Sequence, residues 1–337
     1  MAAGTAVNWY PWLNHPYRQI IAQHQTNRAH HALLVHGLPG MGDESLLWGI
    51  SRWLMCQQRE GLKSCGHCHA CQLMQAHTHP DWHLLGVEKG KSSLGVDAVR
   101  AVTETLFHHA QQGGAKIVTV PDASLLTEAA ANALLKTLEE PPKNCWFLLF
   151  SQQPSRLPAT LRSRCFRYHL AVPDEEQGLA WLQKQISVTE SEALSALRLS
   201  GGAPAAAQSL LEASVWRSRH ALCQVLPLAL RGDILTLIGE LNDDNVQRRT
   251  GWLYSLLVDA LKWQQGGGEF IANVDQQALI ADIAVLLPAN ALNESLRLWI
   301  NCREQLGIAS VNRELILTDQ LLTWEQALRG LQTGSPN

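Results

Sequence analysis

The pattern of apolar and polar positions divides this chain of 337 residues into two regions of different secondary structure. Up to about Leu170, continuous apolar runs at 32–35, 116–120 and 145–150 alternate with segments whose apolar residues recur every three or four positions. Short continuous apolar runs are typical of strands buried on both faces, and their alternation with helices is typical of a parallel sheet. The first region is therefore predicted to be an α/β domain.

Helical periodicity in this first region predicts helices at roughly 17–28, 45–54, from 96 onwards, and at 132–142. In the last of these, apolar residues four positions apart share one face, and two consecutive prolines at 141 and 142 end the helix because proline lacks the backbone N–H. The aromatic cluster at 9–13 is expected to pack as an N-terminal anchor.

Beyond Pro173 the strand pattern stops. Residues 175–200 read as two short helices, Gly-Gly-Ala-Pro at 201–204 breaks the chain, and the pattern from 205 onwards is helical throughout. Apolar residues at helical spacing form three stripes, made of Leu253, Leu256, Leu257, Ala260 and Leu261, of Leu292, Leu296, Trp299 and Ile300, and of Leu317, Leu321 and Trp324. This region is predicted to be a helical bundle in which the stripes mostly form the core, and it contains no catalytic constellation.

Composition narrows the class of protein. A hydrophobic content of 46% and a charged content of 17% fit a globular chain with substantial cores,. The net charge of -3 gives no strong electrostatic footprint for autonomous nucleic-acid binding,. No run approaches the ~20 apolar residues of a membrane span, and residues 1–20 lack a signal-peptide core. We expect a soluble, cytoplasmic protein without a membrane partner, in which cysteines are thiols or metal ligands rather than disulfides.

A glycine-rich stretch at 37–44 follows the first apolar run and precedes a helical segment. Gly37 and Gly42 have the G-x-x-x-x-G spacing of a nucleotide-binding P-loop, but Asp43 and Glu44 replace the lysine and the serine or threonine that follow in such a loop,. A carboxylate ~4 Å from a phosphate oxygen costs about 4 kcal/mol at an effective dielectric constant of about 20. The loop is therefore expected to keep the fold of a nucleotide site without binding ATP. Taken alone, an ordinary glycine-rich turn explains it equally well.

The second half of such a nucleotide site is also altered. In an ATPase the strand at 116–120 ends in Asp-Glu, which serves Mg²⁺ and the attacking water, whereas here it ends in Pro121 and Asp122. Proline has no side-chain ligand for a metal, and an isolated aspartate is more often a turn or cap residue. Ser151 and Gln152, at the end of the run 145–150, offer polar side chains toward a phosphate.

Four cysteines form the strongest chemical signal in the sequence. Cys56, Cys65, Cys68 and Cys71 have the spacing C-x8-C-x2-C-x2-C, and short C-x2-C spacing lets one turn present two sulfurs to one ion. Four thiolates fill a tetrahedral Zn²⁺ shell, so the predicted site is structural and has no open position. An iron–sulfur cluster is the alternative. The nearby histidines that offer substitute ligands are His67, His69, His77 and His79.

The order of these motifs resembles the bacterial clamp-loader AAA+ subunits of DNA polymerase III. The resemblance is carried by the altered P-loop, the four cysteines after it, the sequence N-A-L-L-K-T-L-E-E-P-P at 132–142 and S-R-C at 163–165. It covers nearly the whole chain. The missing P-loop lysine and the opening Trp-Tyr-Pro-Trp-Leu at 9–13 point to the non-motor member of that family.

The resemblance implies a RecA-like AAA+ domain with the zinc module at 1–170, a small helical lid at 171–210 and a helical collar or oligomerisation domain at 211–337. It implies a hetero-pentamer with the δ subunit and three γ or τ subunits, which opens the ring-shaped β sliding clamp and places it on primed DNA. In that assembly this chain is expected to be a fixed surface, and to catalyse nothing alone within a holoenzyme that is a DNA-directed DNA polymerase.

Arg164 acquires a role from the resemblance. It matches the arginine of the family's S-R-C motif, which points into the ATP site of the neighbouring subunit, and such an arginine finger raises phosphoryl-transfer rates by roughly 10³–10⁵. Without the resemblance, a solvated arginine at a domain boundary is the simpler interpretation. The lid's sensor arginine is replaced by Pro204, a third departure from the motor pattern.

Two other functions fit parts of the sequence. A weakly active ATPase that uses backbone amides of the loop would bind ATP as an isolated chain, and the acid at Asp43 argues against it. A zinc-dependent nucleic-acid-binding module would bind DNA alone, and the lack of clustered Lys and Arg around the cysteines argues against that.

Overall fold

The computed structural model describes residues 8–87, 90–112, 114–308 and 312–333. The chain divides into two compact units, Met1–Pro173 and Asp174–Asn337. The boundary coincides with Pro173, where the strand pattern of the sequence stops. Each unit has its own arrangement of elements and is described by itself.

The first unit is built on a five-stranded parallel sheet with the order β2-β3-β4-β1-β5. Its strands are β1 (Ala32–Gly37), β2 (Trp82–Leu84), β3 (Lys116–Val120), β4 (Cys145–Ser151) and β5 (Phe166–Leu170). The three apolar runs of the sequence are the central strands, and every residue of β3 is buried. The expectation of an α/β domain with a parallel sheet is therefore confirmed.

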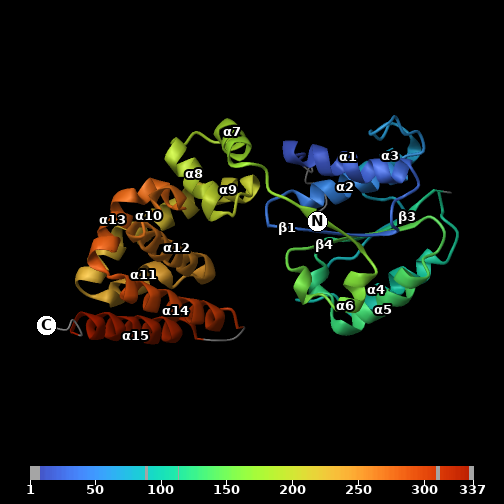
Figure 1. The fold of residues 1–337 in the computed structure, drawn as a ribbon. Helices are drawn as coiled ribbons and strands as arrows, with labels where there is room; N and C mark the ends of the chain where they lie inside the picture. Colours follow the sequence, from blue (N-terminus) through green and yellow to red (C-terminus); the bar gives the residue numbers. More distant parts are fainter. Residues whose placement is uncertain (1–7, 88–89, 113, 309–311, 334–337) are drawn as a thin grey trace. The chain divides into compact units, whose positions relative to one another are not determined.

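Helices cover both faces of this sheet (Figure 1). One face carries α1 (Asn14–Gln25), α2 (Asp43–Met55) and α3 (His69–Gln75), and the other carries α4 (Val96–Leu106), α5 (Glu128–Glu139) and α6 (Ala159–Ser163). The predicted helix at 132–142 is α5, which begins earlier because Thr127 caps it by accepting a hydrogen bond from Ala130 N at 3.2 Å,. It ends before Pro141, as expected.

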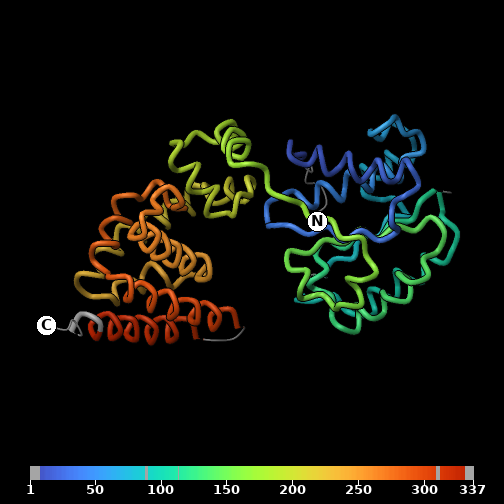
Figure 2. The backbone as a smooth tube through the Cα atoms, in the orientation of Figure 1, coloured from blue at the N-terminus to red at the C-terminus, as the bar shows by residue number. Residues whose placement is uncertain are grey.

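The second unit contains helices only among its described residues, as the backbone tube in Figure 2 shows. Its α-helices are α7 (Glu175–Gln185), α8 (Glu190–Leu199), α9 (Pro204–Leu210), α10 (Ala213–Arg231), α11 (Ile238–Leu241), α12 (Val246–Gln264), α13 (Gln277–Leu286), α14 (Ala289–Leu306) and α15 (Arg313–Thr333). The two predicted short helices are α7 and α8, and Pro204 begins α9 at a position where a helix tolerates proline,.

One apolar core runs through the second unit from α7 to α15. The predicted stripes on α12, α14 and α15 line this core, and both Trp299 and Trp324 are 0% exposed. One assignment was wrong: Ile300 is 42% exposed, because its position directly after Trp299 turns it about 100° away from the buried stripe,. Among the described helices none is by itself long and apolar enough to cross a membrane, and the one pair that meets this test together, Val274–Leu286 and Ala289–Leu306, is bent by 110°.

A buried ion pair connects three parts of the second unit. Arg219 on α10 is 0% exposed and donates to Asp275 Oδ2 at 2.7 Å, Asp275 Oδ1 at 2.9 Å and Asn273 Oδ1 at 2.8 Å. Asn273 donates to Asp259 on α12, and Asp275 N donates to Ser195 on α8 at 3.0 Å. This polar network therefore joins the short helices at the start of the unit to its long helices.

Candidate functional site

The glycine-rich loop connects β1 to the N-terminus of α2. Gly42 precedes the helix in the left-handed region with φ +82°, and Asp43 and Glu44 are acids in the first helical turn. A helix start with free N–H groups attracts anions. Here the Asp43 carboxylate bonds to the backbone of this first turn, where the helix dipole would favour a bound phosphate, and Glu44 adds a second acid to the same turn.

The aromatic N-terminal segment packs against this loop, as expected for an anchor. Trp12 Nε1 donates to Met41 O at 2.7 Å, and Ser45 Oγ on α2 donates to Asn8 O at 2.6 Å. A Cβ atom added at Gly42 would lie 2.4 Å from Cδ2 of Tyr10. The loop therefore needs glycine at this position for two reasons, its positive φ and the Tyr10 ring beside it. This contact has no signal in the local sequence pattern, because the ring and the loop lie far apart along the chain.

Asp43 lies in an unfavourable electrostatic environment for a carboxylate. The pKa of Asp43 is raised to about 6, chiefly by burial and also by the carboxylates of Glu44 and Asp122, while hydrogen bonds to the backbone of the first helical turn act in the opposite direction. Three acids from two separate elements therefore contribute negative potential at this loop. A triphosphate with its own negative charges would meet repulsion there rather than the usual lysine.

The two other positions associated with a nucleotide site are engaged in local turns. Asp122, after β3, accepts hydrogen bonds from Ser124 N at 3.0 Å and from Ser124 Oγ at 2.6 Å, so it caps the short helix that follows. Ser151, at the end of β4, is 0% exposed and its Oγ accepts a hydrogen bond from Gln153 N at 3.2 Å. The prediction that Asp122 is a turn or cap residue is therefore confirmed,.

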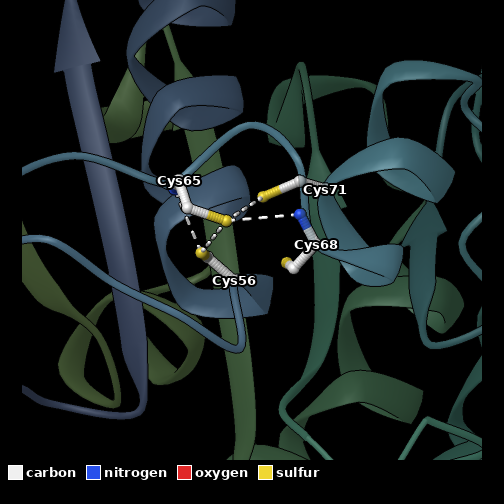
Figure 3. A group of neighbouring side chains, drawn as sticks. All are labelled: Cys56, Cys65, Cys68 and Cys71. Atoms are coloured by element: carbon white, nitrogen blue, oxygen red, sulfur yellow. Dashed lines mark hydrogen bonds between the residues drawn. The ribbon is translucent and has the colours of Figure 1, made fainter.

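The four predicted metal ligands converge. Cys56 follows the last residue of α2, Cys68 is the N-cap of α3, and Cys71 lies in its first turn. Their four sulfur atoms all lie within 4.8 Å of one another, and Figure 3 shows the side chains gathered in this group. Glycines at 61 and 66, with φ of +56° and +79°, form the turns that bring the segments together,.

The geometry of these sulfurs fits zinc. The Sγ atoms of Cys56 and Cys65 are 3.6 Å apart and those of Cys65 and Cys71 are 3.9 Å apart, whereas tetrahedral coordination with Zn–S of about 2.3 Å places sulfurs about 3.8 Å apart. Backbone N–H groups of Cys65 and Cys68 each donate to a sulfur at 3.3 Å, an arrangement that favours thiolates,. In the described chain, none of the eight cysteines is in a disulfide.

The nearby histidines are not part of this group of ligand atoms. His67 is exposed and donates from Nδ1 to Cys65 O at 3.0 Å, while the His77 ring stacks on Trp48 with 4.6 Å between centroids. His79 Nδ1 accepts from Asp81 N at 3.2 Å. The donor set available to an ion is thus four cysteine sulfurs, which leaves no open coordination position and fits a structural site.

Arg164 is the C-cap of α6 and lies two residues before β5 begins. Its Nη1 donates to Thr160 O at 2.9 Å, and its Nη2 forms an ion pair with Glu139 at the end of α5. The arginine side chain is 34% exposed. Sequence reasoning missed Glu139 as its partner; the available signal was an acid in the last turn of a helix, where the dipole disfavours a negative charge.

Three family profiles match successive parts of the chain. The profile for the DNA polymerase III delta subunit matches residues 13–174, that for the AAA+ ATPase lid domain of DNA polymerase III subunit delta' matches 173–212, and that for the C-terminal part of the delta subunit matches 213–326.

Relatives that match over nearly their full length are also DNA polymerase III delta' subunits. The chain is 55% identical over 329 residues to DNA polymerase III subunit delta' of Yersinia pestis, covering 96% of this chain and 97% of that protein. It is 49% identical over 325 residues to subunit delta' of Escherichia coli, covering 96% and 97%. A solved structure of a gamma subunit-related protein from Thermotoga maritima aligns over 94% of this chain and 100% of its own with 20% identity and a TM-score of 0.44.

Proposed function

The chain belongs to the DNA polymerase III subunit delta' family, and on that premise we propose that it is the non-motor subunit of a clamp loader. In this role it joins δ and γ or τ subunits in a hetero-pentamer that loads the β sliding clamp onto primed DNA in the cytoplasm. The match along 96% of the chain supports this assignment most directly. The division into an AAA+ domain at 1–170, a lid at 171–210 and a collar at 211–337 belongs to the same proposal.

The chain's own nucleotide site is proposed to be inactive. Asp43 and Glu44 stand at the helix start in place of the P-loop lysine and hydroxyl, and Pro121 stands in place of a metal-binding acid,. The raised pKa of Asp43, from burial and from two neighbouring carboxylates, indicates that negative charge is already unfavourable at this loop. A triphosphate would add further negative charge without a cation to balance it.

Arg164 is proposed to act on a neighbour's ATP instead. It is partly exposed at the C-terminus of a short helix, and guanidinium groups stabilise the charge that develops on a transferring phosphoryl group,. A subunit that does not hydrolyse ATP can in this way complete the active site of one that does.

Zn²⁺ bound by Cys56, Cys65, Cys68 and Cys71 is proposed to be structural. The ion would tie Cys65, Cys68 and Cys71, which follow the turn at Gly61, to Cys56 at the end of α2. Metal binding of this kind couples directly to folding of the segment that supplies the ligands.

The test is the DNA- and clamp-stimulated ATPase of the reconstituted δ, motor and delta' assembly, with wild-type chain, Arg164→Ala and the control Arg156→Ala. Arg156 is an exposed arginine in the same unit, which makes no ion pair within the described chain. We expect an assembly of unchanged composition in which Arg164→Ala removes about one motor site's share of turnover and Arg156→Ala removes none. If turnover and clamp loading with Arg164→Ala equal those with Arg156→Ala, the finger role is refuted and the subunit is purely architectural.

A weakly active motor subunit is the remaining alternative. Equilibrium dialysis of the isolated chain with labelled ATP distinguishes the two, since the proposed function requires no binding at millimolar nucleotide.

A further inference from the structure

Arg164 does not project freely from the isolated chain. Two acceptors from two different helices hold its guanidinium: the backbone carbonyl of Thr160 at 2.9 Å and the carboxylate of Glu139. Glu139 is 49% exposed and Arg164 is 34% exposed, so water competes for this contact. The pair nevertheless selects one orientation for a side chain that otherwise has many rotamers.

The position of Glu139 is not explained by the stability of its own helix. It is the last residue of α5, where the helix dipole favours a cation, and the basic residue of that turn is Lys136,. Glu140, the next residue, has the same charge and is also exposed. Of these two adjacent acids, Glu139 forms the ion pair with Arg164.

We propose that Glu139 is a positioning residue for Arg164, which fixes the guanidinium in the orientation that it presents to the neighbouring subunit's ATP. This inference rests on the proposed finger role of Arg164. An arginine has five N–H donors, and the contacts with Thr160 and Glu139 use two of them. The remaining donors, which are the Nε–H and one N–H on each of Nη1 and Nη2, stay available to a phosphate while these two contacts hold the side chain,.

The expected effect is modest and measurable. A partly exposed ion pair changes the population of one side-chain orientation by about two- to fivefold. Loss of the pair should therefore lower the rate at the one ATP site that Arg164 serves by the same factor, without preventing turnover at the other sites.

The experiment uses the reconstituted assembly and four variants of the full chain: Arg164→Ala, Glu139→Ala, Glu139→Gln and the control Glu140→Ala. The loss caused by Arg164→Ala defines the finger-dependent part of the stimulated ATPase rate. Glu139→Ala should remove half to four-fifths of that part, while Glu140→Ala should remove none. Glu139→Gln keeps an oxygen acceptor for the guanidinium and should retain more of the rate than Glu139→Ala. If Glu139 acted only through its charge, the two variants would lose the same amount.

A double variant separates positioning from a general structural effect. Glu139→Ala added to Arg164→Ala should cause no further loss, since a residue that acts only through Arg164 has nothing left to position. Thermal unfolding of the four single variants should agree within a few degrees, which shows that the chains remain folded. A Glu139→Ala assembly that is as active as the Glu140→Ala control, or more active than wild type, would overturn the positioning role while leaving the finger intact. If Arg164→Ala itself has no effect, the finger role is refuted, and the positioning role that rests on it is refuted with it.

Discussion

Replacement of Arg219 by methionine tests the buried ion pair between Arg219 and Asp275 in the second unit. Methionine has a similar length and no charge, so Arg219→Met removes the guanidinium from Asp275, whose side chain is 4% exposed, and from Asn273, which is 0% exposed. It also removes the contact between the guanidinium and the Trp216 ring, 4.4 Å from the ring centroid. The carboxylate of Asp275 is then buried without its cation.

The magnitude follows from the burial of both partners. Removing one member of a buried, hydrogen-bonded ion pair costs about 3–5 kcal/mol because the other charge is left uncompensated. The control is Arg231→Met, since the pair between Arg231 and Asp282 is 55% and 61% exposed with a distance of 3.7 Å. Such an exposed pair contributes at most about 1 kcal/mol. The two substitutions are chemically identical, so their difference measures what the buried contacts of Arg219 contribute beyond those of an exposed pair.

The loss should also depend on pH. Burial raises the pKa of Asp275, but hydrogen bonds and the charge of Arg219 lower it more, so that its folded pKa lies below the ordinary value. In the wild type this contribution to stability is present above the unfolded pKa of about 3.9 and is lost as the pH falls through the folded pKa. In Arg219→Met burial remains without the cation, so Asp275 favours its neutral form. The difference in stability should therefore be largest near pH 7 and shrink toward pH 4.

Hydrogen exchange in low concentrations of urea, read by mass spectrometry for peptides from α10 and α12, measures this stability in the second unit alone. Peptides from the sheet of the first unit serve as an internal reference that neither substitution should change. A difference below about 1 kcal/mol between Arg219→Met and Arg231→Met, or one that is the same at pH 7 and pH 4, would refute the argument from an uncompensated buried charge.

Two further predictions concern the first unit. Release of metal by a thiol-reactive reagent should yield about one zinc per chain from the wild type and none from Cys71→Ala. The control is Cys302→Ala, which removes a buried cysteine outside the cluster and should leave the zinc bound. Zinc in Cys71→Ala at the wild-type level would contradict the ligand set. Asp43→Asn should stabilise the chain above pH 6 by up to about 3 kcal/mol and not at pH 4, because a folded pKa raised from 3.8 to about 6 penalises folding only where the carboxylate would ionise,. Denaturant unfolding at both pH values checks this, and the exposed first-turn acid Asp97, changed to Asn, should give no such gain.

Features that depend on neighbouring residues could be predicted from the sequence alone. The runs 116–120 and 145–150 became β3 and β4 because a strand buried on both faces requires continuous apolar residues,. Helix α5 ended before two prolines for a reason contained in the proline ring,. The four cysteines converged because C-x2-C spacing places two sulfurs on one turn,. The missing P-loop lysine was likewise visible without a structure.

Other features depended on how distant segments pack, and periodicity carries no information about that. Trp12 reaches Met41 across 29 positions, and Arg219 reaches Asp275 across 56. Whether Ile300 faced the core or solvent depended on which side of α14 the neighbouring helices cover, which its position in an apolar stripe did not decide. The sequence by itself determined the elements, the metal ligands and the altered phosphate loop, because these follow from local chemistry. The tertiary structure alone decided that Tyr10 lies against Gly42 and that Glu139 holds Arg164, because each contact joins elements whose relative position is set by the whole sheet.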